Sequence, residues 1–197
     1  MSRPSSRQRR VVILSLAIIV FVMAYYGGSK YKNHDKDAPK ISGLSIHPPT
    51  PLPPMADTDD QETPIRQSML LDHWSLLTLD PHQGQDRSPA LVRLLQIHNR
   101  LAVSPELQQQ LQYLYLPRQA DEASQQAITA LNDNINGLAG EPDQIAETFR
   151  RFGVDPDGSE ATLYLIGPEA KLHALFTPAE DAATIAQDVT TLITNNQ

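Results

Sequence analysis

The sequence predicts an α/β domain, in which helices flank a mixed β-sheet, preceded by one N-terminal transmembrane helix. Two short apolar runs, each followed by an amphipathic helical pattern, indicate parallel strands joined by helices. Two later apolar runs separated by a Gly-Pro turn indicate an antiparallel hairpin. An uncharged stretch near the N-terminus indicates the membrane span. Beyond that stretch, the chain of 197 residues has room for one domain of roughly 140 to 150 residues.

The N-terminal stretch, residues 11–28, carries no charge and is long enough for a helix to cross ~30 Å of hydrocarbon. A cleaved signal peptide is the competing interpretation, but cleavage requires small residues where Tyr25 and Tyr26 stand. Paired tyrosines at the end of an apolar run suit the membrane interface. We therefore expect a retained anchor behind a basic cytoplasmic tail, residues 1–10.

The size of the remaining body indicates how this anchor is oriented. Four lysines after the span nearly balance four arginines before it, so charge bias alone does not decide the topology. Long domains cross a membrane with little regard to local charge, so we expect a single-pass inner-membrane protein with a periplasmic C-terminal domain. Residues 29–51, charged and then proline-rich, are predicted to be an extended linker, and residues 52–197 the domain.

The first strand and helix of the domain are predicted on either side of a polar loop. The apolar run from Trp74 to Leu79 suits a central strand that ends at Asp80-Pro81. After the loop, Ser88 can cap a helix, and Pro89 suits its first position. The face of this helix toward the sheet is predicted to carry Leu91, Leu94, Leu95, His98 and Leu101, and the face toward water Arg93, Gln96 and Arg100.

The later elements follow the same reasoning. Proline and acidic residues at 141–143 open a helix that buries Ile145, Phe149 and Phe152 and ends at Gly153. The other predicted elements are a strand over 111–116, a helix over 120–131, a hairpin of strands 163–166 and 171–176 around the turn 167–170, and a last helix over 179–193. This pattern alone leaves several α/β topologies open.

Composition excludes several kinds of chemistry. Because the chain has no cysteine, it has no disulfide, no thiolate metal ligand and no cysteine nucleophile. Setting aside the four arginines of the tail changes the formal net charge from −7 to −11, which opposes nucleic-acid binding. The common hydrolase, zinc-protease and nucleotide-binding motifs are missing, so we expect no enzymatic activity.

Several segments occur in an order and spacing shared with one known family. They are Leu52-Pro53-Pro54-Met55 with Thr58-Asp59, Trp74-Ser75-Leu76-Leu77, Pro142-Asp143-Gln144-Ile145 with Phe152-Gly153-Val154, Tyr164 to Glu169, and Leu172 to Phe176. Through them the chain, from about Leu52 to Ile193, resembles the Sco/SenC family of copper chaperones of cytochrome oxidase assembly. The resemblance implies a thioredoxin-like fold, a membrane anchor and a protein partner among oxidase subunits or assembly factors.

Members of that family hold copper with a C-x-x-x-C pair and a distant histidine. Placing Pro89 on the proline after the pair puts Gly84 and Ser88 at the cysteine positions. Counting back from Pro168 puts Ser159 at the histidine position. Glycine has no side-chain donor, and a serine hydroxyl is a weak ligand for copper. The resemblance therefore implies a divergent member without a copper site and without a cofactor.

Two other functional hypotheses concern the loop that follows Asp80. The loop is predicted to bind the protein partner through Pro81, His82, Gln83, Gln85, Asp86 and Arg87. The alternative is a copper or other metal site rebuilt from His82 with His47, His73 or Met55, although no two histidines have helical or strand ligand spacing. We expect His98 and His173 to be structural and the acidic turns 57–60 and 155–158 to be ordinary turns.

Overall fold

The computed structural model describes residues 39–54, 64–82, 88–119 and 122–196. The predicted tail and transmembrane helix, residues 1–28, lie outside these ranges. None of the helices within the four ranges is both long and apolar enough to cross a membrane. The anchor therefore stays a prediction.

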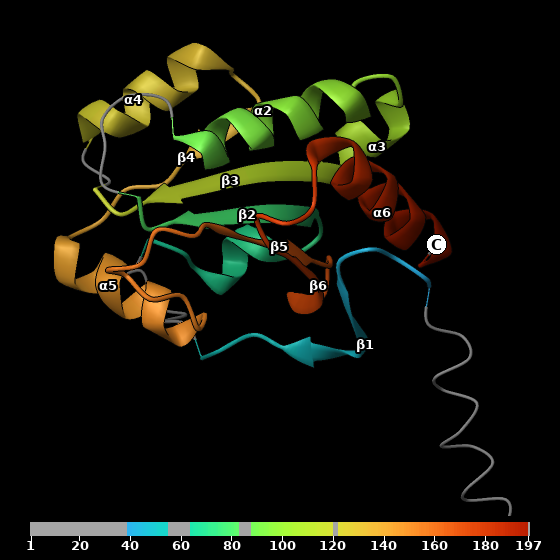
Figure 1. The fold of residues 1–197 in the computed structure, drawn as a ribbon, viewed down its shortest axis with the longest axis horizontal. Coiled ribbons are helices and arrows are strands. Elements are labelled where there is room, and N and C mark those ends of the chain that lie inside the picture. Colours follow the sequence, from blue (N-terminus) through green and yellow to red (C-terminus); the bar gives the residue numbers. More distant parts are fainter. Residues whose placement is uncertain (1–38, 55–63, 83–87, 120–121, 197) are drawn as a thin grey trace, which may run out of the picture. The chain divides into compact units, whose positions relative to one another are not determined.

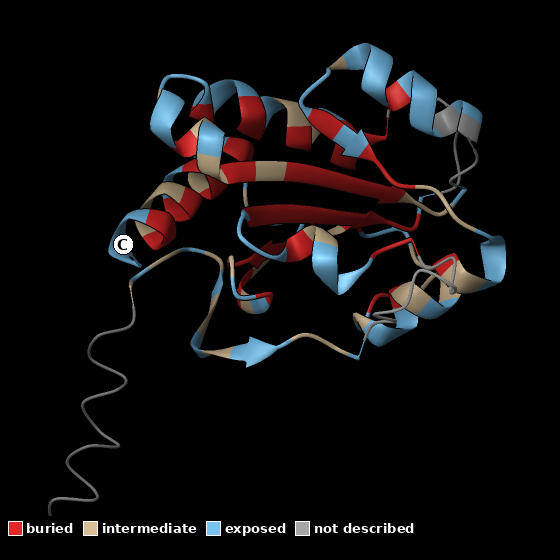
Figure 2. Ribbon diagram, turned by 180° about the vertical axis from the view of Figure 1, so that it is seen from behind, coloured by how far each residue is buried: buried red, intermediate tan, exposed pale blue. Residues whose placement is uncertain are grey.

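The domain is built on one mixed six-stranded sheet (Figure 1). Its strands lie in the order β1-β6-β5-β2-β3-β4. Their bounds are β1 Leu44–Pro51, β2 Trp74–Asp80, β3 Leu111–Pro117, β4 Ile135–Gly137, β5 Thr162–Ile166 and β6 Lys171–Phe176. The central strand β2 is parallel to β3 and antiparallel to β5, and every one of its residues is buried. Figure 2 shows β2 and β3 as the buried middle of the sheet.

Helices cover both faces of this sheet. Their bounds are η1 Gln67–Leu70, α2 Pro89–Leu101, α3 Pro105–Gln110, α4 Glu122–Leu131, α5 Pro142–Arg151 and α6 Ala182–Asn195. The first hydrophobic core joins α2, α3, α4 and α6 to one face, and it includes Leu76 of β2. The second core joins η1 and α5 to the other face, and it includes Leu77. Successive residues of the strand thus point into different cores, as strand geometry requires.

The main predicted elements are confirmed. The helix after the polar loop begins with Ser88 as its N-cap, whose hydroxyl accepts from the Ala90 N–H at 3.1 Å, and with Pro89 as its first residue. The predicted hairpin is β5 with β6, an antiparallel pair. The helix with Ile145 and Phe149 buried is α5, after which Gly153 has φ +75°, a conformation that favours glycine.

The predicted linker is wrong at its C-terminal end. Residues 44–51 do not simply precede the domain but form β1, which pairs with β6 at the edge of the sheet. An edge strand tolerates proline because one row of its N–H groups has no partner strand. The strand also buries little apolar surface, and Leu44 is 62% exposed. Its sequence therefore lacks the alternation of apolar and polar residues that would indicate a strand. The pattern likewise does not indicate η1, α3 or the short β4.

Both histidines predicted to be structural are buried. His173 lies 2.8 Å from a carboxylate oxygen of Glu169 and makes an edge contact with Trp74 at 4.7 Å between ring centroids, which confirms the prediction of a hydrogen-bonded core histidine. The ring of His98 meets Tyr113 edge-on at 4.9 Å. Its Nδ1 atom has no hydrogen-bond partner among the described residues.

We predict that His98 makes the stability of the domain depend on pH. Burial lowers the pKa of His98 below its usual 6.5, so the unfolded chain binds this proton more tightly than the folded protein. The contribution of the neutral, buried His98 to the free energy of unfolding is fully present above about pH 6.5, and it is lost as the pH falls below that value. Between about pH 7.5 and about pH 5.5, the free energy of unfolding measured with urea should therefore decrease by a smaller amount in His98→Phe than in the wild type. His73→Phe, at an exposed histidine, should behave as the wild type, and equal losses in all three proteins would refute this role of His98.

Candidate functional site

The candidate site lies where β2 and β3 end, and we call it the Asp80 end of the sheet. Asp80 is the last residue of β2, and the N-cap of α2 follows eight residues later. The pairing of Leu79 with Thr162 brings the start of β5 to the same place. In α/β folds, functional groups gather at the carboxyl ends of parallel strands. The predicted partner-binding loop, residues 81–87, connects β2 to α2 here.

The Asp80 carboxylate joins the segments that meet at this end. It is only 2% exposed, and a charge buried to this degree requires hydrogen bonds. Its Oδ2 atom accepts from the hydroxyls of Ser88 and, at 2.6 Å, of Tyr115. Its Oδ1 atom accepts from the His82 N–H at 3.0 Å, and its backbone carbonyl from the Arg118 N–H at 2.9 Å. One residue therefore holds β3, the start of the loop and the start of α2.

The protonation of Tyr115 supports this arrangement. Burial is the largest cause that raises the pKa of Tyr115, and the charge and hydrogen bond of Asp80 raise it further, whereas the hydrogen bond of Ser88 lowers it. Tyr115 therefore keeps its proton at physiological pH. It serves as a fixed hydrogen-bond donor to Asp80 and not as an acid or base.

Two arginines secure the segment from Asp155 to Ala161, which precedes β5. The Arg118 side chain donates to the carbonyl of Pro156 and pairs with Asp157 at 2.6 Å. Arg93 on α2 donates to the carbonyl of Ala161 at 3.4 Å and to that of Thr177 at 2.7 Å. The segment is thus tied to the end of β3 on one side and to α2 on the other.

The position of Arg93 corrects the expectation that it faces water. The helical pattern places Arg93 opposite the apolar stripe, but the chain at Ala161 and Thr177 folds over it and leaves it half-buried. Burial lowers the pKa of Arg93 from its usual value, although the charges of Glu180 and Asp80 raise it. The guanidinium remains charged, and it acts as a brace between α2 and two loops.

The structure describes only some of the predicted site residues. Ser88 is buried and bonded to Asp80, Pro81 is buried, and the side chain of His82 is exposed. Ser159 is exposed in the segment secured by the two arginines. The remaining predicted residues, Gly84 at a lost ligand position and Gln83, Gln85, Asp86 and Arg87 in the loop, lie outside the described residues.

The histidines of the alternative metal site are not brought together. His47 lies in the edge strand β1, whereas His73 directly precedes β2 at the end opposite Asp80. Met55 lies outside the described residues. Within the part of the chain that the structure describes, no three histidine, aspartate or glutamate side chains form a group able to hold a metal ion. No observation here favours a rebuilt site.

Sequence reasoning does not find the residues that organise this end. In the sequence, Asp80 marks only the point where a strand stops, and Tyr115 is only part of an apolar run. A charged residue at the end of a fully buried strand, followed by proline and then by a capping serine, is the local signal that points to them. The Ser88 hydroxyl donates to Asp80 and accepts from the Ala90 N–H, so in this arrangement it connects the end of β2 to the start of α2.

The sequence matches no protein-family model and no curated protein. The structure, in contrast, is similar to solved Sco proteins. Yeast Sco1 with copper bound superimposes with a TM-score of 0.54 at 19% identity, over 65% of this chain and 82% of that one. Arabidopsis thaliana ScoI with copper bound gives 0.52 at 14% identity, over 65% and 89%. BsSco, described as a member of the Sco family of cytochrome c oxidase assembly proteins, gives 0.50 at 18%, over 64% and 84%.

These similarities concern the fold, because the identities are low. They agree with the observed mixed sheet, with its central parallel pair, its antiparallel hairpin and helices on both faces. The chain therefore has the fold of these solved Sco proteins, a thioredoxin-like mixed sheet flanked by helices.

Proposed function

We propose that this protein is a membrane-anchored, non-catalytic interaction factor of cytochrome c oxidase assembly, which binds a protein partner through the Asp80 end of its Sco-like domain. The observation that carries the proposal is the state of Ser88. This residue stands at a position matched to a family cysteine, yet its hydroxyl is committed to Asp80 and to the cap of α2. The end that would carry the copper ligands is instead built from internal hydrogen bonds.

The residues of this chain do not fit copper. Two of the three matched positions, Ser88 and Ser159, are serines, and the third, Gly84, is a glycine. Neither thiolate nor imidazole stands at any of them, whereas Cu(I) prefers these ligands. The exchange of thiols and disulfides has no reactant in a chain without cysteine. With neither copper ligands nor thiols at these positions, we infer that the domain recognises a protein partner.

The location follows from the predicted anchor. An N-terminal span at residues 11–28, with the domain on the periplasmic side of the inner membrane, would place the domain where oxidase subunits expose their outer segments. Support comes from the uncharged 18-residue stretch and from the likeness of the domain to Sco proteins. The acidic body, with a formal charge of −11 beyond the tail arginines, favours a partner with a basic surface.

The test is a capture experiment with the full chain from solubilised membranes. We expect oxidase subunits, other assembly factors or an intact Sco protein to be recovered by the wild type. The double variant His82→Ala with Arg87→Ala should recover at least about tenfold less of the partner than the wild type does. The matched control is His73→Ala, which changes an exposed histidine at the opposite end of β2 and should recover as much as the wild type. Recovery of none of these proteins would overturn the proposal.

Copper binding distinguishes the proposal from its alternative. If the purified full chain retained one equivalent of copper against a strong competing chelator, a rebuilt metal site would replace the interaction hypothesis. We expect the metal to pass entirely to the chelator.

A further inference from the structure

Asp188 on α6 is a buried carboxylate that serves a distant part of the chain. It is 6% exposed, and its Oδ2 atom accepts from the backbone N–H groups of Ser42 at 2.8 Å and Gly43 at 3.0 Å. These two residues precede Asp188 by 146 and 145 positions. Because a buried carboxylate requires such donors, α6 holds a site that the segment before β1 completes.

The same segment fits closely against β6. A Cβ atom at Gly43 would overlap the ring of Phe176 and lie 2.9 Å from the carbonyl oxygen of Leu175. Ile41 packs against the first core. Glycine is therefore needed at position 43 because the backbone passes directly over Phe176, at the point where Asp188 holds it.

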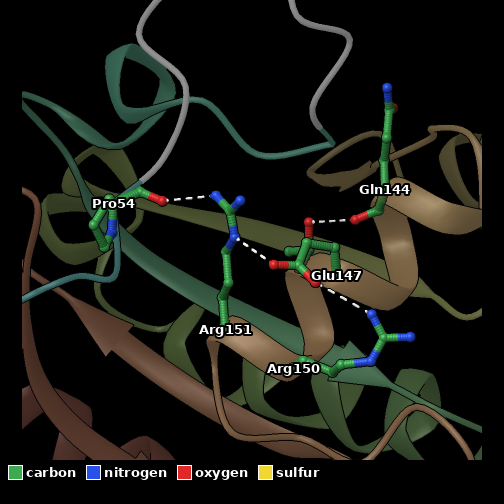
Figure 3. Close-up of polar contacts among 6 residues, drawn as sticks. Pro54, Gln144, Glu147, Arg150 and Arg151 are labelled. Atoms are coloured by element: carbon green, nitrogen blue, oxygen red, sulfur yellow. Dashed lines mark hydrogen bonds and ion pairs between the residues drawn. The ribbon is translucent and has the colours of Figure 1, made fainter.

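A second attachment lies at the other end of the segment, on α5. Arg151 donates to the carbonyl of Pro54 at 2.9 Å (Figure 3). Glu147 orients this arginine, since it accepts from Arg151 at 3.1 Å and from Arg150 at 3.2 Å. Leu52 packs against the second core. The segment is thus attached both to α6 and to α5, two helices on opposite faces of the sheet.

Between the two attachments the pairing is irregular. β1 pairs with β6 at Leu44 and Ser45 and again at Thr50 and Pro51, and the register shifts between these pairs. Prolines occupy positions 48, 49 and 51, so they supply no N–H to a ladder. The ladder to β6 is therefore irregular in the middle of the segment, and the bonds of Asp188 and Arg151 lie outside it, at the two ends of the segment.

We propose that residues 39–54 form a strap that is held to the domain at two points. The bonds of Asp188 to Ser42 and Gly43 are the α6 latch, and the bond of Arg151 to Pro54 is the α5 latch. The strap sets how much free chain separates the domain from residues 1–38. With both latches closed, residues 39–54 are held against the domain. With both open, up to 16 residues become free chain, which can span as much as about 50 Å. The opening of the α6 latch removes the two N–H donors of Asp188, which water can replace, and it exposes the half-buried side chain of Ile41.

Amide hydrogen exchange of the full chain tests the α6 latch. In Asp188→Ala, the amides of Ser42 and Gly43 should exchange at least about tenfold faster, because each loses a hydrogen bond to a charged group. Gly43→Ala should give the same result with α6 unchanged, since its methyl group meets Phe176. Asp188→Asn retains an acceptor oxygen and should have a smaller effect. Gln187→Ala, at the neighbouring exposed position of α6, should have none.

The α5 latch offers a matched pair of variants. Both Arg150 and Arg151 bind Glu147, but of the two only Arg151 donates to Pro54. Because the chain has no cysteine, Leu52→Cys introduces its only thiol. In that background, Arg151→Ala should raise the rate of thiol labelling several-fold, and Arg150→Ala should not.

Two results would overturn the strap. One is unchanged exchange at Ser42 and Gly43 in both Asp188→Ala and Gly43→Ala. The other is an equal acceleration of exchange in β2 and β3, which would mean that the segment opens only when the whole domain unfolds. Exchange that rises only at the altered latch supports the proposal.

Discussion

Replacement of Asp80 by alanine is expected to lower the free energy of unfolding by about 3 kcal/mol. The change removes the acceptor for two hydroxyls, those of Ser88 and Tyr115, and for the N–H of His82. Each buried donor left without an acceptor costs about 1 to 3 kcal/mol, and relief from burying a carboxylate offsets part of that sum. Urea denaturation followed by circular dichroism measures the loss.

Two further substitutions separate the role of Asp80 from that of a nearby charge. Asp157→Ala removes the ion pair with Arg118, but the Asp157 side chain is 77% exposed, so the loss should stay below about 1 kcal/mol. Ser88→Ala removes one bond to Asp80 and the cap of α2, for an intermediate loss of about 1 to 2 kcal/mol. If Asp80→Ala unfolded at the same urea concentration as Asp157→Ala, Asp80 would not organise this end of the sheet.

The elements that sequence reasoning finds are those whose pattern is local and complete. β2 is a run of seven buried residues, and α2 begins with a serine cap and a proline, so both are visible without any knowledge of their neighbours. The hairpin of β5 and β6 needs only two short runs and the turn between them. These elements determine the fold class, because alternating strands and helices followed by a hairpin require a mixed sheet.

The organisation of the candidate site depends on contacts between distant residues. Tyr115 reaches Asp80 because β2 and β3 pair in parallel, and a strand pattern does not specify which tyrosine faces which carboxylate. Arg93 lies on the side of α2 away from the stripe, yet the chain at Thr177, 84 residues later, folds over it. β1 pairs with β6, which is distant in the sequence, and buries little surface, so its sequence has the composition of a linker.

The predicted stripe of α5 also leads to the largest expected loss of stability. Phe149 has no exposed surface and fills the second core between α5 and the sheet. Phe149→Ala should lower the free energy of unfolding by about 4 kcal/mol, because the apolar contacts are lost and the surrounding residues close the cavity only in part. For a domain of this size the melting temperature should fall by roughly 10 °C, which calorimetry measures.

Phe152 provides the comparison within the same stripe. It is half-buried, and its ring meets Tyr164 edge-on at 5.2 Å between centroids. Phe152→Ala should therefore cost about 1 to 2 kcal/mol. Equal losses for the two variants would show that α5 does not pack on the sheet through Phe149.

The consequences of Phe149→Ala should extend to the strap, because α5 carries the arginine that holds Pro54. Loss of Phe149 loosens the whole helix, so thiol labelling in the Leu52→Cys background should rise together with the loss of stability. Arg151→Ala should raise the same labelling rate while the free energy of unfolding changes by less than about 1 kcal/mol, since Arg151 is exposed. The two variants thus distinguish opening of a latch from loosening of the helix on which it is built.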